Sequence, residues 1–174
     1  MPISQKSNSV RKICVLLFES FSNHCLANAM EPFRAANTIA RKQLYSWQHV
    51  SLSGGTVTSS SGLPVATSAW SEAKPGGDYL FIMPSYGFEA FAGPSTVRAL
   101  KAARQRFGTL VGMDTGAWLL ASAGLLEGRK ATIHWDELTG FAERFPDVDA
   151  VEDRFVLDGN ICTCGGASTT WAIC

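Results

Sequence analysis

The chain has 174 residues, of which 46% are hydrophobic and 17% charged, and its 15 basic residues balance its 15 acidic ones. These values are typical of a single globular domain with a sizeable core. The neutral balance excludes a basic surface large enough to hold nucleic acid. Apolar stretches stay short of the roughly 18 residues that a membrane-spanning helix needs, so no membrane partner is expected.

The chain contains an odd number of cysteines, at positions Cys14, Cys25, Cys162, Cys164 and Cys174. Residues 1–12 are polar and lack the apolar segment of an export signal, so we expect reduced thiols in the cytoplasm. The C-x-C pair at 162–164 has no second pair beside it, and no metal site is expected. The glycine motifs that cradle phosphates are absent as well, so the sequence predicts no cofactor.

In the first two thirds of the chain, short apolar runs alternate with helical patterns. Buried or alternating strands are predicted at residues 13–18, 46–53, 79–84 and 108–113, and turn residues at 54–64 predict a small hairpin. Helices are predicted from Ser22 or Asn23 to about Arg41 with a kink at Pro32, from Ser95 or Thr96 to Phe107, and from the elbow described below to Ala123. The basic residues 98, 101, 104 and 106 fit a solvated helix face or a binding patch.

The remaining residues continue the pattern. A short extended piece is predicted at 131–135, a helix capped by Asp136 and reaching Phe145, and a hairpin at 154–164. Together the elements predict an α/β three-layer sandwich with a mostly parallel, flavodoxin-like sheet. Residues 18–21, 84–87, 113–116 and 134–135 fall at the carboxyl ends of the strands, where such folds bind ligands.

The stretch "GMDTGAWLLA" (residues 112–121) has the glycine spacing of a nucleophile elbow, a sharp strand-to-helix turn that exposes one side chain. The exposed residue is normally a serine or cysteine, and here it is Asp114. An aspartate at this place could attack a substrate, cap the following helix or anchor a ligand.

Several stretches together make the chain resemble the ThiJ/PfpI superfamily, and more narrowly the sensor domain of AraC/XylS-type transcriptional regulators. They are "LLFESFSNHCLANAMEPFRAAN" (16–37), "SSSGL" (59–63), "GMDTGAWLLASAGLLEGRKATIHW" (112–135), "FAERFPDV" (141–148) and "GNICTCGGAS" (159–168). The resemblance implies a class I glutamine amidotransferase-like fold, a homodimer and a helix-turn-helix DNA-binding domain beyond residue 174. We therefore expect that residues 1–174 form a sensor domain cut within its last helix, with DNA contacted only through the missing domain.

Enzymes of this superfamily resemble one another in an elbow cysteine, a supporting acid and a Gly-Gly oxyanion turn. This chain has Asp114 at the elbow, Cys25 at the position that aligns with the acid, and Ser85-Tyr86 in the turn. The resemblance therefore implies a domain without catalytic residues. The alternative is a hydrolase or hydratase acting through Asp114 and His134, and a third possibility is a bare dimerisation module whose pocket is empty and smaller than about 100 Å³.

An anchoring role for Asp114 suits a small amine or amino-acid-like effector, because carboxylates and aromatic rings together bind ammonium groups. The relatives with aspartate here also look like sensors of such metabolites. The predicted ligand-binding residues are Asp114, Thr115, His134, Trp135, Ser85, Tyr86, Glu31 and Phe21. Several have alternatives: His134 could be satisfied by backbone, Trp135 could be core, and Glu31 could lie at the surface. Trp118 is a further aromatic candidate, and its position one turn into the helix favours the core.

Overall fold

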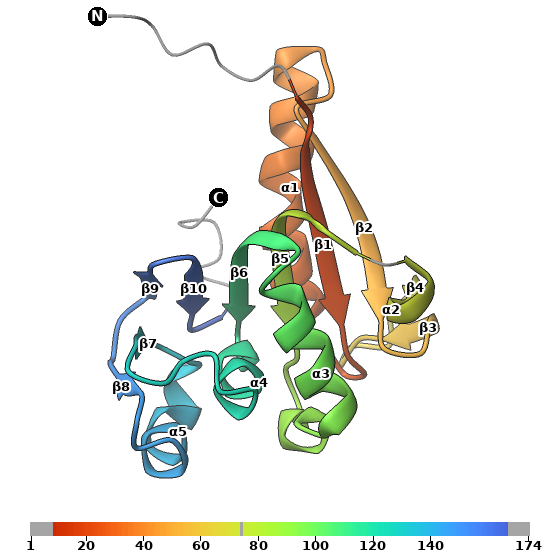
Figure 1. Ribbon diagram of the computed structural model, residues 1–174. Coiled ribbons are helices and arrows are strands. Elements are labelled where there is room, and N and C mark those ends of the chain that lie inside the picture. The colour runs from red at the N-terminus through yellow and green to blue at the C-terminus, as the bar shows by residue number, and fades with distance from the viewer. Residues whose placement is uncertain (1–8, 74, 167–174) are drawn as a thin grey trace, which may run out of the picture.

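The computed structural model describes residues 9–73 and 75–166 and contains one large sheet with helices on both faces (Figure 1). The strands are β1 (Arg11–Leu17), β2 (Tyr45–Ser51), β3 (Gly55–Thr58), β4 (Pro64–Ala69), β5 (Gly77–Met83), β6 (Phe107–Met113), β7 (Lys130–Ala131), β8 (Asp149–Ala150), β9 (Phe155–Asp158) and β10 (Ile161–Cys164). The α-helices are α1 (Asn23–Ala40), α2 (Trp70–Ala73), α3 (Pro94–Ala103), α4 (Gly116–Ser122) and α5 (Leu138–Arg144), and two 3-10 turns are η1 (Phe88–Phe91) and η2 (Trp135–Glu137).

The eight-stranded sheet has the order β3-β4-β2-β1-β5-β6-β10-β9, and β7 and β8 form a separate parallel pair. All pairs from β4 to β10 are parallel, while the hairpins β3/β4 and β9/β10 make antiparallel edges. This confirms the predicted α/β sandwich and both predicted hairpins. Parallel order places the carboxyl ends of β1, β5, β6 and β10 at one edge of the sheet.

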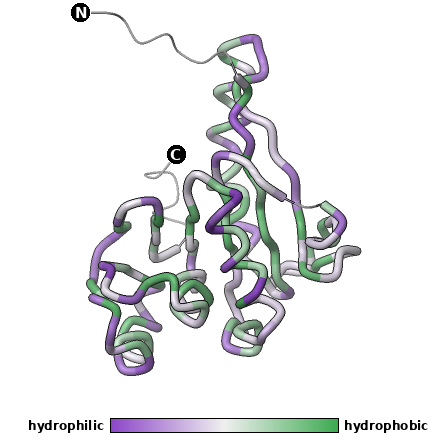
Figure 2. The backbone as a smooth tube through the Cα atoms, viewed as in Figure 1, coloured by the Kyte–Doolittle hydropathy of each residue, from purple (hydrophilic) through white to green (hydrophobic). Residues whose placement is uncertain are grey.

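The core lies in two layers on opposite faces of the sheet. Successive residues of β1 alternate between them: Ile13, Val15 and Leu17 pack with α1 on one face, whereas Cys14 and Leu16 pack on the face that carries α3, α4 and α5. Figure 2 shows the hydrophobic segments along the central strands. Strands buried on both faces need apolar residues at every position, which is why the "ICVLLF" run does not alternate.

Two of the predicted helices differ from the structure. Helix α3 ends at Ala103, and Phe107, predicted as its last inward residue, begins β6 instead. Asp136 does not cap a helix: the side chain of His134 caps η2 by accepting from the backbone N–H of Asp136, and α5 begins later, at Leu138.

The predicted final helix, residues 167–174, lies outside the described residues. None of the helices within 9–73 and 75–166 combines the length and hydropathy that crossing a bilayer requires.

Candidate functional site

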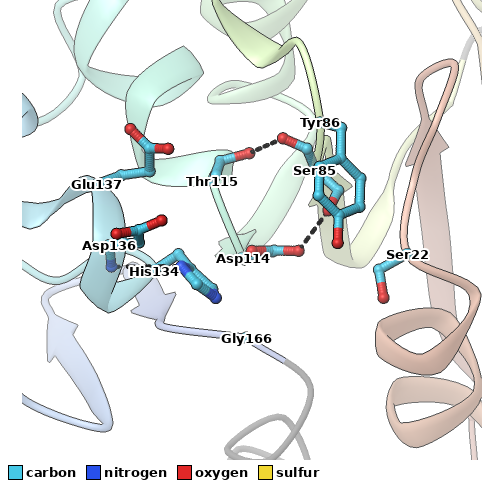
Figure 3. Close-up of a pocket in the computed structure, with 9 residues that line it drawn as sticks. All are labelled: Ser22, Ser85, Tyr86, Asp114, Thr115, His134, Asp136, Glu137 and Gly166. Atoms are coloured by element: carbon cyan, nitrogen blue, oxygen red, sulfur yellow. Dashed lines mark hydrogen bonds between the residues drawn. The ribbon is translucent and has the colours of Figure 1, made fainter. Parts of the chain in front are cut away.

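A pocket of about 220 Å³ opens at the carboxyl edge of the sheet (Figure 3). It lies where four parallel strands end and where their connecting segments meet. The residues that line it are Ser22, Ser85, Tyr86, Asp114, Thr115, His134, Asp136, Glu137 and Gly166. The pocket therefore brings together five of the eight predicted ligand-binding residues: Asp114, Thr115, His134, Ser85 and Tyr86.

The elbow between β6 and α4 holds Asp114 at the centre of this pocket. Asp114 has φ +58°, a left-handed conformation that aspartate tolerates better than most residues. Both flanking glycines are required by close packing. A Cβ on Gly116 would lie 2.6 Å from the carbonyl oxygen of Ile82, and one on Gly112 would lie 3.0 Å from the backbone nitrogen of Ala117. The tight helix–strand contact explains the glycine spacing seen in the sequence.

The carboxylate of Asp114 is held from the neighbouring strand end. Ser85 Oγ donates a 2.8 Å hydrogen bond to Asp114 Oδ2, and Thr115 Oγ1 donates one of 3.1 Å to the backbone carbonyl of Ser85. Asp114 is only 8% exposed, and this burial raises its pKa above the ordinary value, although the Ser85 hydrogen bond and the nearby His134 act in the opposite direction. A buried carboxyl with a raised pKa gains from a cationic partner, because the partner stabilises the ionised form.

The interpretation of Asp114 as a simple helix cap is wrong. The N-cap residue of α4 is Thr115, and the start of this fully described helix has no side-chain capping bond. The Asp114 side chain turns instead toward Ser85 and the cavity, as Figure 3 shows. Asp114 has a left-handed backbone, whereas a capping residue normally has an extended one.

His134 is fixed by its neighbours on both sides. Its backbone N–H donates to the carbonyl oxygen of Asp114 at 3.1 Å, and its Nδ1 accepts from the backbone N–H of Asp136 at 3.4 Å. Because Nδ1 is the acceptor, a neutral imidazole here carries its proton on Nε2. That nitrogen can donate to a ligand, while the backbone contacts keep the ring in place.

Two acidic residues complete the pocket and were missed as ligand-binding candidates. Asp136 and Glu137 belong to the η2 turn, and with Asp114 they are three acidic residues that line one cavity, among whose described lining residues there is no lysine or arginine. Within the described part of the chain, no cluster of His, Cys, Asp and Glu has the arrangement of a metal site. The pair "DE" directly after "HW" is the available sequence signal, but the same pattern also fits a helix cap at Asp136.

The structure does not bring three predicted residues into this pocket. Phe21 is fully buried in the core layer beneath α1. Glu31 lies on the exposed side of α1, where it pairs with Arg34 at 2.6 Å. Trp135 is 73% exposed and lines a neighbouring cavity beside Arg154 and Gly165. Trp118 lies in the core, as its position favoured, so Tyr86 is the one Phe, Tyr or Trp among the described residues that line the pocket.

Comparisons with known proteins agree with this architecture. The HTH-type transcriptional regulator GlxA of Rhizobium meliloti (strain 1021) is 38% identical over 95% of this chain, and the HTH-type transcriptional regulator CdhR of Pseudomonas aeruginosa is 36% identical over 89%. The chain spans about half of these relatives, 52% and 46% of their lengths. A shorter match of 68 residues, 43% identical, covers 38% of this chain and 27% of the isonitrile hydratase of Pseudomonas putida.

The fold of this chain is also similar to those of solved structures. The crystal structure of an AraC family transcriptional regulator from Pseudomonas putida superposes with a TM-score of 0.78 at 24% identity, over 93% of this chain and 87% of that one. The sequence pattern of the DJ-1/PfpI family matches residues 11–174, which is nearly the whole chain. Sheet order, elbow and family match lead to one conclusion: this chain belongs to the DJ-1/PfpI family, in the form found in HTH-type transcriptional regulators.

Proposed function

We propose that this chain is the effector-binding domain of a transcriptional regulator, and that its pocket binds a small cationic metabolite, an amine or an amino-acid derivative, without converting it. The observation that carries the proposal is the set of three acidic residues, Asp114, Asp136 and Glu137, that line one cavity. A cation neutralises this charge and stabilises the ionised form of the buried Asp114. The volume of about 220 Å³ suits a ligand smaller than a typical drug molecule.

The same geometry argues against a bare dimerisation module. The cavity is larger than the roughly 100 Å³ expected of a closed, empty site. Trp135 does not line this pocket and Tyr86, which does, is 66% exposed, so the two rings do not close the pocket between them. The polar atoms of Ser85, Asp114 and His134 converge on one space, which is the pattern of a ligand site.

The elbow lacks the cysteine nucleophile of the superfamily's enzymes, which supports ligand binding rather than catalysis. Asp114 stands at the elbow in place of the cysteine that the superfamily's enzymes carry, and its carboxyl accepts a hydrogen bond from Ser85. Cys25 is buried against the sheet and does not line the pocket. The relatives named as transcriptional regulators point in the same direction.

The test is thermal unfolding of the chain with primary amines, amino acids, betaines and their neutral isosteres. A bound compound at 100 times its dissociation constant adds roughly 2.7 kcal/mol to the free energy of unfolding. We expect a cationic compound to stabilise the wild type and Glu89→Gln, an exposed control carboxylate outside the pocket, but not Asp114→Asn. The proposal fails if no cation shifts the transition or if the shift is the same in Asp114→Asn.

A second candidate is a hydrolase or hydratase using Asp114 and His134. It is favoured by their shared pocket and by the short match to an isonitrile hydratase. In this scheme the Asp114 carboxylate attacks the acyl carbon of an ester or amide, the alcohol or amine leaves with a proton, and water activated by His134 hydrolyses the resulting anhydride to release the acid and restore Asp114. A nitrile or isonitrile carbon would be attacked in the same way, with its nitrogen or carbon taking up a proton instead of a group leaving. Turnover of esters, amides, nitriles or isonitriles that disappears in Asp114→Asn would establish it, and no turnover by the wild type would exclude it.

The likeness to transcriptional regulators supports two further proposals. We propose that the domain acts as a homodimer and that DNA is bound by a helix-turn-helix domain following residue 174, since the matched relatives are about twice as long and are named HTH-type. An effector can alter DNA binding only if it binds one arrangement of the dimer better than the other. Sedimentation of the chain with and without the stabilising amine measures both dimerisation and its response to ligand.

A further inference from the structure

A second cavity lies between α3 and α2, beside Leu52, which follows β2. It has a volume of about 470 Å³, larger than the acidic pocket, and the two cavities share no residue. Its floor and walls include Leu52, Trp70, Ala99 and Ala102. This volume lies within the range of sites for small organic molecules.

The shape of this cavity follows from the sequence of α3. Ala99 and Ala102 are two of the α3 residues that line it, and their methyl groups leave room that longer side chains would fill. The indole of Trp70, the first residue of α2, is half-buried and stands opposite the helix. A flat apolar body therefore finds an aromatic surface on one side and a shallow helix face on the other.

The charge of this cavity is opposite to that of the elbow pocket. Arg98 and Arg106 line it, and no carboxylate does. The hydrogen bond recorded for the Arg98 guanidinium goes to the hydroxyl of Ser95, at 3.4 Å, and neither arginine forms an ion pair with the described residues. Guanidinium groups without acidic partners are ready to bind carboxylate or phosphate oxygens, which they do in a forked geometry.

We propose that this cavity is a second ligand site, separate from the elbow pocket, and that it takes a small organic anion: a carboxylate or phosphate carried on a flat apolar body. The apolar body packs between Trp70 and the alanine face of α3, and the anionic group pairs with Arg98 or Arg106. The domain then has one acidic and one basic ligand site. The basic residues of α3 and of the turn that follows it form two pairs: Arg98 and Arg106 line the cavity, whereas Lys101 and Arg104 are exposed and do not line it.

The test is calorimetric titration of the 174-residue chain with 1-naphthoate, compared with its neutral isostere 1-naphthamide and with inorganic phosphate. Two charge-matched double variants separate the site from general attraction: Arg98→Gln/Arg106→Gln removes the cavity cations, and Lys101→Gln/Arg104→Gln removes two cations from the same segment outside it. All four side chains are exposed. The single variant Arg98→Gln carries the test if the first double variant does not fold.

We expect one naphthoate per chain, a dissociation constant raised at least tenfold in Arg98→Gln/Arg106→Gln, and a change of less than twofold in Lys101→Gln/Arg104→Gln. Naphthamide should bind at least tenfold more weakly than naphthoate, and Trp70→Leu should weaken naphthoate as well. The proposal is overturned if the wild type shows no saturable binding, if both double variants lose affinity equally, or if phosphate alone binds as tightly as naphthoate.

Discussion

Ser85 Oγ and Asp114 Oδ2 are 2.8 Å apart, and this hydrogen bond joins the ends of two neighbouring parallel strands, β5 and β6, inside the candidate site. Both residues are buried, at 7% and 8% exposure. The bond uses one oxygen of the carboxyl group. The other, Oδ1, lies on the side of Gly166, where a Cβ added to that glycine would stand 4.0 Å away. Oδ2 thus holds the side chain in place, and Oδ1 faces the space between the strand ends.

Removing the Ser85 hydroxyl should change the pH dependence of the site. The Ser85 hydrogen bond lowers the pKa of Asp114 against the larger effect of burial, so Ser85→Ala should raise that pKa further. The pH at which cation binding reaches half its maximum should therefore move upward. Titration of the Asp114 carboxyl carbon by NMR in wild type and Ser85→Ala measures the shift directly. Ser95→Ala, which removes an exposed hydroxyl, serves as the control.

Affinity for a cation should rise with pH and then level off. Because the folded-state pKa of Asp114 is raised, the carboxyl keeps its proton to higher pH than a free aspartate and offers no negative charge while protonated. Binding should be weak below the raised pKa and constant above it. Titrations of one amine, in its charged form throughout, at several pH values test this. A flat profile in wild type would show that Asp114 does not contact the ligand.

Asp114→Asn should weaken cation binding without lowering the thermal stability of the fold. A raised folded-state pKa means that the folded protein binds more protons than the unfolded chain, so this group's contribution to stability falls as pH rises from 3.8 through the folded value. Asparagine avoids this loss and tolerates the left-handed backbone. The midpoint of thermal unfolding should therefore match wild type near pH 3 and equal or exceed it at pH 7, while cation affinity falls roughly 10- to 100-fold.

The two rim carboxylates should contribute less than Asp114. Asp136 is exposed and Glu137 half-exposed, and charge interactions at such positions are worth roughly 0.2–1 kcal/mol. We expect Asp136→Asn and Glu137→Gln each to weaken a cation by less than about fivefold, with greater loss at low ionic strength. Titrations in 20 mM and 300 mM salt compare the variants with Asp114→Asn. Equal losses in all three would contradict a central role for Asp114.

Gly116→Ala should destabilise the fold strongly. The added Cβ would lie 2.6 Å from a backbone oxygen of β5, which cannot move aside as a side-chain tip can. Overpacking of this kind costs roughly 1–3 kcal/mol. Gly140→Ala is the matched control, since Gly140 lies in α5 with nothing within 4 Å of its added Cβ, and alanine there should stabilise by up to about 1 kcal/mol. Urea unfolding of both variants gives the comparison.

The sequence by itself determined the elements and the sheet class. Apolar runs such as "ICVLLF" require burial on both faces, and only a covered parallel sheet supplies that. The elbow could also be predicted from the sequence. A left-handed turn between a strand and a tightly packed helix needs glycines at fixed positions, and these glycines are visible in the sequence. The predicted end of a helix was wrong where apolar residues continue from a helix into the next strand. Phe107 is the example, because its apolar side chain fits the end of a helix and the start of a strand equally well.

Only the tertiary structure decided which side chains share the site. Periodicity fixes the face of a residue within a helix or strand, but it does not fix the direction of side chains in a short irregular turn. Asp136 and Glu137 reach the pocket because η2 is held against the elbow by the backbone bond from His134 to Asp114, a contact 20 residues apart in sequence. Phe21 and Glu31 lie outside the site for tertiary reasons as well: Phe21 precedes α1, bridges to Ser59 and is buried in the core, and Glu31 lies on the solvent side of α1.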